Sequence, residues 1–564
     1  MPLPICATIL LAVASIALLS GRWTHERIRW ICAAGYFVAL LGAMVALALT
    51  PIKSAEFVEV RQNPAAFRND GLAACEQWIV LSYGLMVGIA SCDAIKRGEQ
   101  TAGTYGWWLF VVSGLLLISS ANDFLSLGLS FEVLNLALMA LGRLTKPVDR
   151  FHSADSQLAN RSAVATHSTM QFDWLASVWM WIGIGLLAYT AASTEFGPLA
   201  LVLADSYDPL MGDAPVGTPS KLMLLATGLI SISLLTRMGL VPVHLGFAQH
   251  THTSTERSSG FLLLARQLAG AIAITRVFGC VFVALGPALN VLSATLLLAT
   301  CSVVVLLAIR GFSPGIRSIP YWVASLTMLQ SVWLVIGPMI AAMELEHTGV
   351  NWGAFKGQSE TLALVVFNQL VSLLASAGLI STLAHLKRPD REIEFLEDVK
   401  GLGRRSMSAS FGLVVGLAGL IGCPLTAAFW ARWTLLLAGH NIHSKAHSAI
   451  YIPYEGVRVV MLAAGFATMA GIVVVVRLSR EMFLESPLSR PTAIGGRGVL
   501  VVGMFAGIAS LFLGFCPESV LVPLGVIQHP RIMAPEDQQR GSGSNPVGLK
   551  RGTGETVAQS VTGS

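Results

Sequence analysis

The chain contains repeated apolar runs about 20 residues long, and these runs constrain its fold more than any other feature. A helix of that length crosses the hydrocarbon core of a bilayer, where the backbone must satisfy its own hydrogen bonds. Hydrophobic residues make up 54% of the 564 residues and charged residues only 12%, whereas soluble proteins carry about 25% charged residues. This composition excludes a soluble enzyme, a nucleic-acid-binding protein and a disordered scaffold. It predicts an integral membrane protein that contacts the lipid bilayer and no nucleic acid.

Fourteen runs are long and apolar enough to be transmembrane helices, which predicts an all-α, polytopic bundle of about 14 spans. The first run has no preceding basic region and no clear small-residue cleavage site, so we interpret it as a span and not as a signal peptide. The polar pair Asn122 and Asp123 divides one long run into two helices. The predicted spans lie near residues 3–20, 30–50, 75–94, 106–121, 124–142, 174–193, 221–243, 259–284, 287–309, 320–342, 361–386, 407–439, 455–476 and 498–526.

Lysine and arginine are distributed unevenly between alternate loops. The loops after odd-numbered spans hold 22 of these residues, and the loops after even-numbered spans hold 6. Because cytoplasmic loops carry the excess of basic residues, this pattern predicts that both termini lie on the non-cytoplasmic side of the membrane. The tail at 527–564 is rich in Gly, Ser, Gln and Pro, and we expect it to be disordered.

Glu132 is the most informative ionisable residue inside a predicted span, because a carboxyl group is costly in the membrane. The functional interpretation is a carboxylate that relays protons or couples their movement. The alternative is an acid that is held by a polar neighbour for helix packing.

Several arginines also fall within the apolar runs. Arg237 lies five residues before Pro242, and Arg432 lies eight residues after Pro424. Proline breaks or kinks a helix, and a broken helix with a charge at mid-membrane is typical of transporters. Alternatively, these arginines extend to the interface or cap freed carbonyl groups. Arg266 and Arg276 lie ten residues apart in one predicted span, nearly three helical turns, so we expect them roughly on one face. Arg276 is near the helix end and is interpreted as an anchor.

Histidine and cysteine residues do not form a recognisable metal or redox motif. His244 follows Pro242, and further histidines occur nearby and in a second loop, but no cysteine or carboxylate completes a site. The eight cysteines are scattered, mostly in apolar runs, which favours a packing role. The sequence has no Walker-type loop, no dinucleotide fingerprint in context and no nucleophile motif.

Three segments carry a resemblance to a known family. They are ISSANDFLSLGLSFEVLNLALMAL, SLLTRMGLVPVHL and LEDVKGLGRRS followed by GLAGLIGCPLTAAFWARW. Together they resemble the antiporter-like membrane subunits of respiratory complex I, over about residues 106–480. Within that group, the L-V-P-x-H form and the length are most similar to subunit N of NADH-quinone oxidoreductases.

The resemblance implies an antiporter-like fold with two inverted five-helix repeats and broken helices. It implies this division of the chain: 1–105 for the first three spans, 106–284 and 285–480 for the two repeats, 481–526 for the last span and 527–564 for the tail. It also implies other complex I membrane subunits as partners, in the cell inner membrane. NADH, FMN, iron–sulfur clusters and quinone would serve the whole complex, with no redox cofactor in this chain.

Several family positions carry different chemistry here. Glu132 matches the family's membrane glutamate, but Arg237 and Arg432 stand where the family has lysine, and Gln267 stands at a third lysine position with Arg266 beside it. The resemblance implies proton transfer through two half-channels that use these residues, with His244 at the family's motif histidine. Arginine keeps its proton at any accessible pH, so the arginines are poor proton carriers. The alternatives are therefore a non-pumping structural or coupling subunit, and a component of a related cation/proton antiporter or membrane-bound hydrogenase.

Overall fold

The structure is a computed structural model, and it describes most of the helical part of the chain. The chain divides into a unit of Met1–Val526 and a unit of Ile527–Ser564. The second unit, which holds the tail predicted to be disordered, lies outside the described residues. The described residues are 5–19, 26–50, 66–96, 102–144, 156–206, 221–240, 257–282, 286–311, 319–347, 360–387, 396–445, 452–486, 493–494 and 496–521.

These residues form an all-α fold, to which one antiparallel pair of two-residue strands is added. The strands are β1 (Leu386–Lys387) and β2 (Ala493–Ile494), and the short helices are η2 (Val277–Val281), η4 (Leu396–Val399), α14 (Leu402–Arg405) and α19 (Glu518–Leu521). The longer helices are α1 (Ile5–Leu19), α2 (Glu26–Leu49), α3 (Gly71–Lys96), α4 (Ala102–Ser120), α5 (Phe124–Leu144), α6 (Ser156–Ala191), α7 (Phe196–Ser206), α8 (Lys221–Arg237), α10 (Arg257–Arg276), α11 (Gly286–Gly311), α12 (Ile319–His347), α13 (Glu360–His385), α15 (Met407–Ile421), α16 (Ala427–Lys445), α17 (Ile452–Phe483) and α18 (Arg497–Phe515).

Helices occupy all fourteen predicted span positions. Among the described residues, ten helices are long and apolar enough to cross a membrane, and three shorter helices are also strongly apolar. The chain is therefore a multi-pass membrane protein with at least ten candidate spans. The count of fourteen and the orientation of the termini stay predictions.

Three predicted spans have the wrong boundaries. The span expected at 498–526 contains α18, which ends at Phe515, and the separate short helix α19. The span expected at 174–193 belongs to α6, which begins at Ser156, because hydropathy detects where a helix enters lipid and not where the helix starts. The span expected at 407–439 is two helices, α15 and α16. Gly422 and Leu425 between them both have a φ of 78°, a left-handed conformation that ends an α-helix. Pro424 lies between these two residues and removes a backbone donor.

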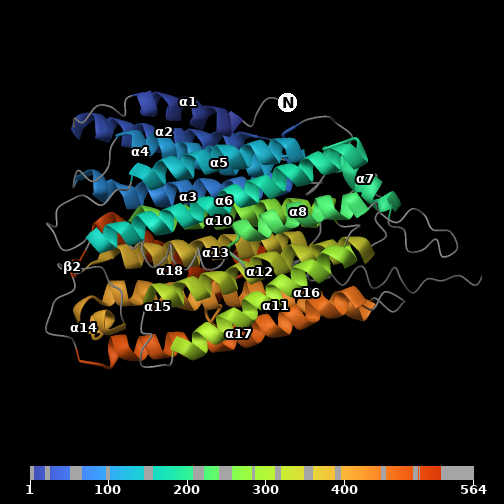
Figure 1. Ribbon diagram of the computed structural model, residues 1–564. Helices are drawn as coiled ribbons and strands as arrows, with labels where there is room; N and C mark the ends of the chain where they lie inside the picture. The colour runs from blue at the N-terminus through green and yellow to red at the C-terminus, as the bar shows by residue number, and fades with distance from the viewer. Residues whose placement is uncertain are drawn as a thin grey trace, which may run out of the picture. The chain divides into compact units, whose positions relative to one another are not determined.

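Helix α13 lies at the centre of the bundle and packs against α3, α10, α12, α15, α16 and α18. Figure 1 shows these helices side by side, with their axes roughly aligned. The most apolar windows of α12, α10 and α13 are 100%, 94% and 89% buried, whereas that of α6 is 33% buried. Polar side chains on α10, α12 and α13 are therefore enclosed by protein and shielded from lipid.

Candidate functional site

Charged side chains from three helices line one cavity of about 300 Å³. Glu132 comes from α5, Asp173 from α6 and Arg266 from α10. Arg266 Nη2 lies 2.8 Å from Asp173 Oδ2, so these two residues form an ion pair across the cavity. Glu132 is partly buried, and Trp181 Nε1 donates a long hydrogen bond of 3.4 Å to its Oε1. Among the described residues, the Glu132 carboxylate therefore has one weak donor, and it is open to the cavity.

Arg237 lies beside this cavity at the end of α8 and is only 6% exposed. Its Nη1 donates to Asn135 Oδ1 at 3.2 Å, and its Nη2 donates to Ser177 Oγ at 3.0 Å. Its guanidinium carbon lies 4.2 Å from the centre of the Phe131 ring, within cation–π range. Asn135 and Ser177 also line the cavity, and no ion pair joins Arg237 to Glu132. Neutral side chains therefore connect the arginine to the Glu132 cavity.

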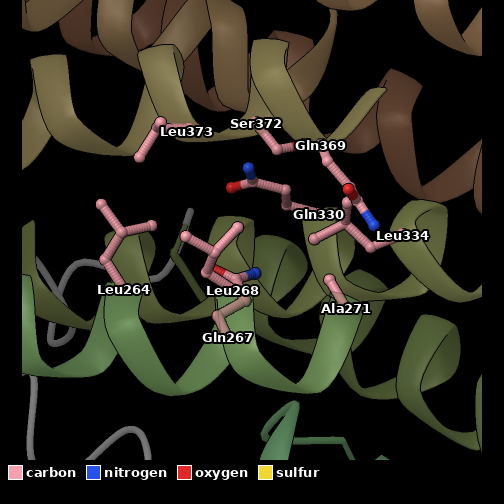
Figure 2. Close-up of a pocket in the computed structure, with 9 residues that line it drawn as sticks. All are labelled: Leu264, Gln267, Leu268, Ala271, Gln330, Leu334, Gln369, Ser372 and Leu373. Atoms are coloured by element: carbon pink, nitrogen blue, oxygen red, sulfur yellow. The ribbon is translucent and has the colours of Figure 1, made fainter. Parts of the chain in front are cut away.

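Gln267 lies next to Arg266 in the sequence but faces a different pocket. Its Nε2 donates to Ser331 Oγ at 2.9 Å and to the Thr327 carbonyl at 3.3 Å, both on α12. The pocket that it lines has a volume of about 10 Å³, and Figure 2 shows Gln330 and Gln369 there as well. A volume of this size has room for about one water molecule. The α10 helix therefore turns one polar residue to the Glu132 cavity and the next to the bundle centre.

Arg432 lies on α16, where it caps the broken end of α15. Its guanidinium is 5% exposed and donates to the carbonyl oxygens of Leu420 and Ile421, the last residues of that helix. Cations are favourable at helix C-termini, where carbonyl groups lack helical partners. A side chain at Gly422 would collide with the guanidinium, so glycine here serves both the left-handed turn and the approach of Arg432.

The structure thus brings Glu132, Arg266 and Arg237 together and places Gln267 and Arg432 elsewhere in the bundle. His244, the remaining predicted site residue, lies outside the described residues, as does Pro242. Within the described ranges, no three His, Cys, Asp or Glu side chains are close enough to hold a metal ion.

Sequence reasoning missed Asp173 and misread Arg276. Asp173 fell in an expected loop because the polar start of α6 does not resemble a span, although it lies one turn from Ser177 on the same helix. Arg276, expected to be an interfacial anchor, is buried and forms a 2.8 Å ion pair with Asp70. The pair is long-range in sequence, so no local pattern indicated it.

We expect Asp173→Asn to destabilise the bundle, because it leaves the Arg266 guanidinium without its partner. The two side chains are 17% and 12% exposed, so the loss should be about 1 to 3 kcal/mol, below the roughly 3 to 5 kcal/mol of a fully buried pair. Denaturation of the purified protein in detergent measures this loss. The double variant Asp173→Asn/Arg266→Gln should recover most of it, and additive losses in the double variant would contradict the pairing.

Known proteins with similar sequences include subunits named N of oxidoreductases. No protein-family model matches the chain. NADH-quinone oxidoreductase subunit N 3 of Streptomyces griseus is 24% identical over 492 residues, which cover 86% of this chain and 78% of the relative. F420H2 dehydrogenase subunit N of Methanosarcina mazei is also 24% identical, over 76% of this chain and 80% of that protein.

Solved structures share the fold. A chain of respiratory complex I from Thermus thermophilus with bound aureothin has a TM-score of 0.66 at 18% identity and covers 93% of this chain and 100% of its own length. A chain of the Mrp complex from Dietzia sp. has a TM-score of 0.68 at 14% identity and covers 93% of this chain and 96% of its own length.

Proposed function

We propose that this chain, a distant homologue of subunit N of NADH-quinone oxidoreductases, transfers protons across the cell inner membrane when quinone is reduced elsewhere in the same complex. It is an antiporter-like membrane subunit of the complex I family. The proposal gives it no redox cofactor, because NADH, FMN, the iron–sulfur clusters and quinone would bind other subunits. It also places both termini on the non-cytoplasmic side, as the loop charges predict.

The observation that carries this proposal is the charged cavity between α5, α6 and α10. An acid beside an ion pair in a membrane-embedded bundle is costly, and such groups mark ion or proton pathways. Among the described residues that line the cavity, Asp173 and Arg266 pair with each other and Glu132 has no ion pair, so we assign Glu132 the proton-carrying role. Arg237 and the Asp173–Arg266 pair supply fixed charges that set the electrostatic field at Glu132.

The remaining predicted residues extend the proposal through the bundle. Gln267 would hold water at the centre, and Arg432 would be a fixed cation at the break between α15 and α16. His244 would exchange protons at the family's motif position. In this proposal, residues 106–284 and 285–480 form the two inverted repeats, between the segments at 1–105 and 481–526.

Neighbouring membrane subunits are the proposed partners. The cavity opens beside strongly exposed apolar side chains, among them Leu136 at 59% and Trp174 at 62%. A charged cavity that faced lipid directly would be unfavourable. A second subunit that covers α5 and α6 would shield the charges and bury the apolar surface.

Two other functions have support in particular observations. Arginine at positions 237 and 432 cannot release a proton, which favours a non-pumping structural or coupling subunit. The shared fold with the Mrp complex chain favours the second alternative, a component of a related cation/proton antiporter or membrane-bound hydrogenase.

A test of the proposed function uses the native complex reconstituted in vesicles with a pH-sensitive dye inside. We expect NADH oxidation by quinone to drive proton transfer in sodium-free buffer, and a protonophore to collapse the pH difference. Proton movement that needs a sodium or potassium gradient, with no electron donor, would assign the chain to an antiporter. Electron transfer without any proton movement would favour the structural subunit.

A further inference from the structure

Glu76 is a buried acidic residue that does not line the Glu132 cavity. It lies on α3, five residues beyond Gly71, or about 7.5 Å along the helix axis. Its exposure is 0%, and neither carboxyl oxygen makes a hydrogen bond of good geometry with the described residues, although the Gln369 side chain lies near enough to interact with it. The adjacent Gln77 is equally buried, and its two amide atoms also lack partners there. Buried polar atoms are nearly always satisfied by protein or by ordered water, so this group indicates a hydrated site.

Two charged residues act on Glu76, and they already pair with each other. Arg276 and Asp70 interact electrostatically with the carboxyl group, while their own ion pair measures 2.8 Å. The three side chains together are neutral when Glu76 holds a proton, and they carry one negative charge when it does not. Because an uncompensated buried charge is costly, the arrangement is suited to a carboxyl group that takes up and releases a proton.

Gln369 on α13 is the next polar neighbour of Glu76. Its Nε2 donates to Thr275 Oγ1 at 2.9 Å, and the Thr275 hydroxyl donates to the Ala271 carbonyl at 2.8 Å. Because the Thr275 hydroxyl proton is already donated to the Ala271 carbonyl, the Thr275 oxygen can only accept a hydrogen bond from Gln369. The Gln369 amide nitrogen must therefore face Thr275. Its Oε1 then has no donor among the described residues. This oxygen is complementary to a protonated carboxyl group or to a water molecule.

Gln369 also connects this region to the centre of the bundle. It lines the 10 Å³ pocket of Gln267, together with Gln330 and Ser372 (Figure 2). Gln330 Oε1 accepts from Ser376 at 2.9 Å, and Gln267 donates to Ser331. A sequence of buried polar side chains therefore leads from the start of α3, through Glu76 and Gln369, to a water-sized space beside Gln267.

We propose that Glu76 is a proton-holding site on this path, which connects the membrane face where α3 begins with the Gln267 pocket. A proton from water near the Asp70–Arg276 pair would bind the Glu76 carboxylate and form an O–H bond. That bond would break as the proton passes to water beside Gln369, and no electron is transferred. The site rests on the proposed function, because it supplies a path for the protons that the chain is proposed to transfer.

The test is infrared spectroscopy of the whole native complex, combined with the vesicle assay. The carbonyl-stretching band of a protonated carboxylic acid should be present in wild type and absent from the Glu76→Gln variant, which has nearly the same shape. Glu76→Asp should restore a carboxylic acid band. Transfer to heavy water should shift the wild-type band, because a proton on a water-connected path exchanges. Proton transfer should fall about tenfold or more in Glu76→Gln and recover in part in Glu76→Asp.

Each contrary outcome overturns a defined part of this assignment. Equal carboxylic acid bands in wild type and Glu76→Gln would show that Glu76 carries no proton. A band that does not shift in heavy water would make Glu76 a sealed packing residue. Proton transfer at the wild-type rate in Glu76→Gln would remove it from the path. If the wild-type complex moves no protons, the proposed function fails, while the infrared comparison still decides whether Glu76 holds an exchangeable proton.

Discussion

Replacement of Glu132 by glutamine should sharply lower proton transfer while the complex still assembles. The carboxylate lines the 300 Å³ cavity and, within the part of the chain that the structure describes, accepts a single long hydrogen bond from Trp181, so an amide of the same shape fits without new strain. The change removes the ionisable group that we assign to carry the proton. We expect proton transfer to fall by about a hundredfold, the lower end of what a positioned proton-transfer group contributes. Proton movement per NADH oxidised, measured in vesicles, reports the loss separately from electron transfer.

Glu195→Gln is the matched control for this experiment. Glu195 is partly buried, lies outside the cavity and pairs through its backbone with Asp123. Its replacement should leave proton transfer unchanged. If Glu132→Gln pumps as well as Glu195→Gln, Glu132 is a packing acid and the chain is better described as a structural subunit.

Replacement of Arg432 by methionine should destabilise the helix break between α15 and α16. The guanidinium donates to the carbonyl groups of Leu420 and Ile421, which would lose their charged donor in the variant. Two such bonds contribute roughly 3 kcal/mol or more in total, at about 1.5 kcal/mol or more each. We expect a lower midpoint of denaturation in detergent and faster proteolysis near residues 422–426.

Arg432→Lys distinguishes the effect of the two hydrogen bonds to carbonyl groups from the effect of the positive charge. Lysine keeps a cation near the helix end but lacks the planar fork that reaches two carbonyl groups. It should recover only part of the stability. If lysine instead raises proton transfer while stability is unchanged, the residue at 432 acts as a proton carrier, and the fixed-cation role is wrong.

Hydropathy predicted the helical positions because each span must cross the same apolar thickness, whatever its neighbours. It failed at α6, where a polar first half does not resemble a membrane segment although it continues the same helix. It also joined α15 to α16, because the composition on either side of Pro424 is equally apolar. Pattern reasoning singled out Glu132 and Arg237 because each is an ionisable residue within an apolar run. It could not place them near the same cavity, since the two residues are far apart in sequence.

The sequence by itself determined that the chain spans a membrane, where most of its helices lie and that Glu132, Arg237, Arg266 and Arg432 are ionisable residues within them. These properties depend on local composition and on the cost of exposing backbone or charge to lipid. Only the tertiary structure decided the partners of those residues: Asp173 for Arg266, Asp70 for Arg276 and the end of α15 for Arg432. It also revealed that Glu76 is fully buried near the Asp70–Arg276 pair. Pairing of this kind depends on how helices distant in sequence pack, which no single apolar run encodes.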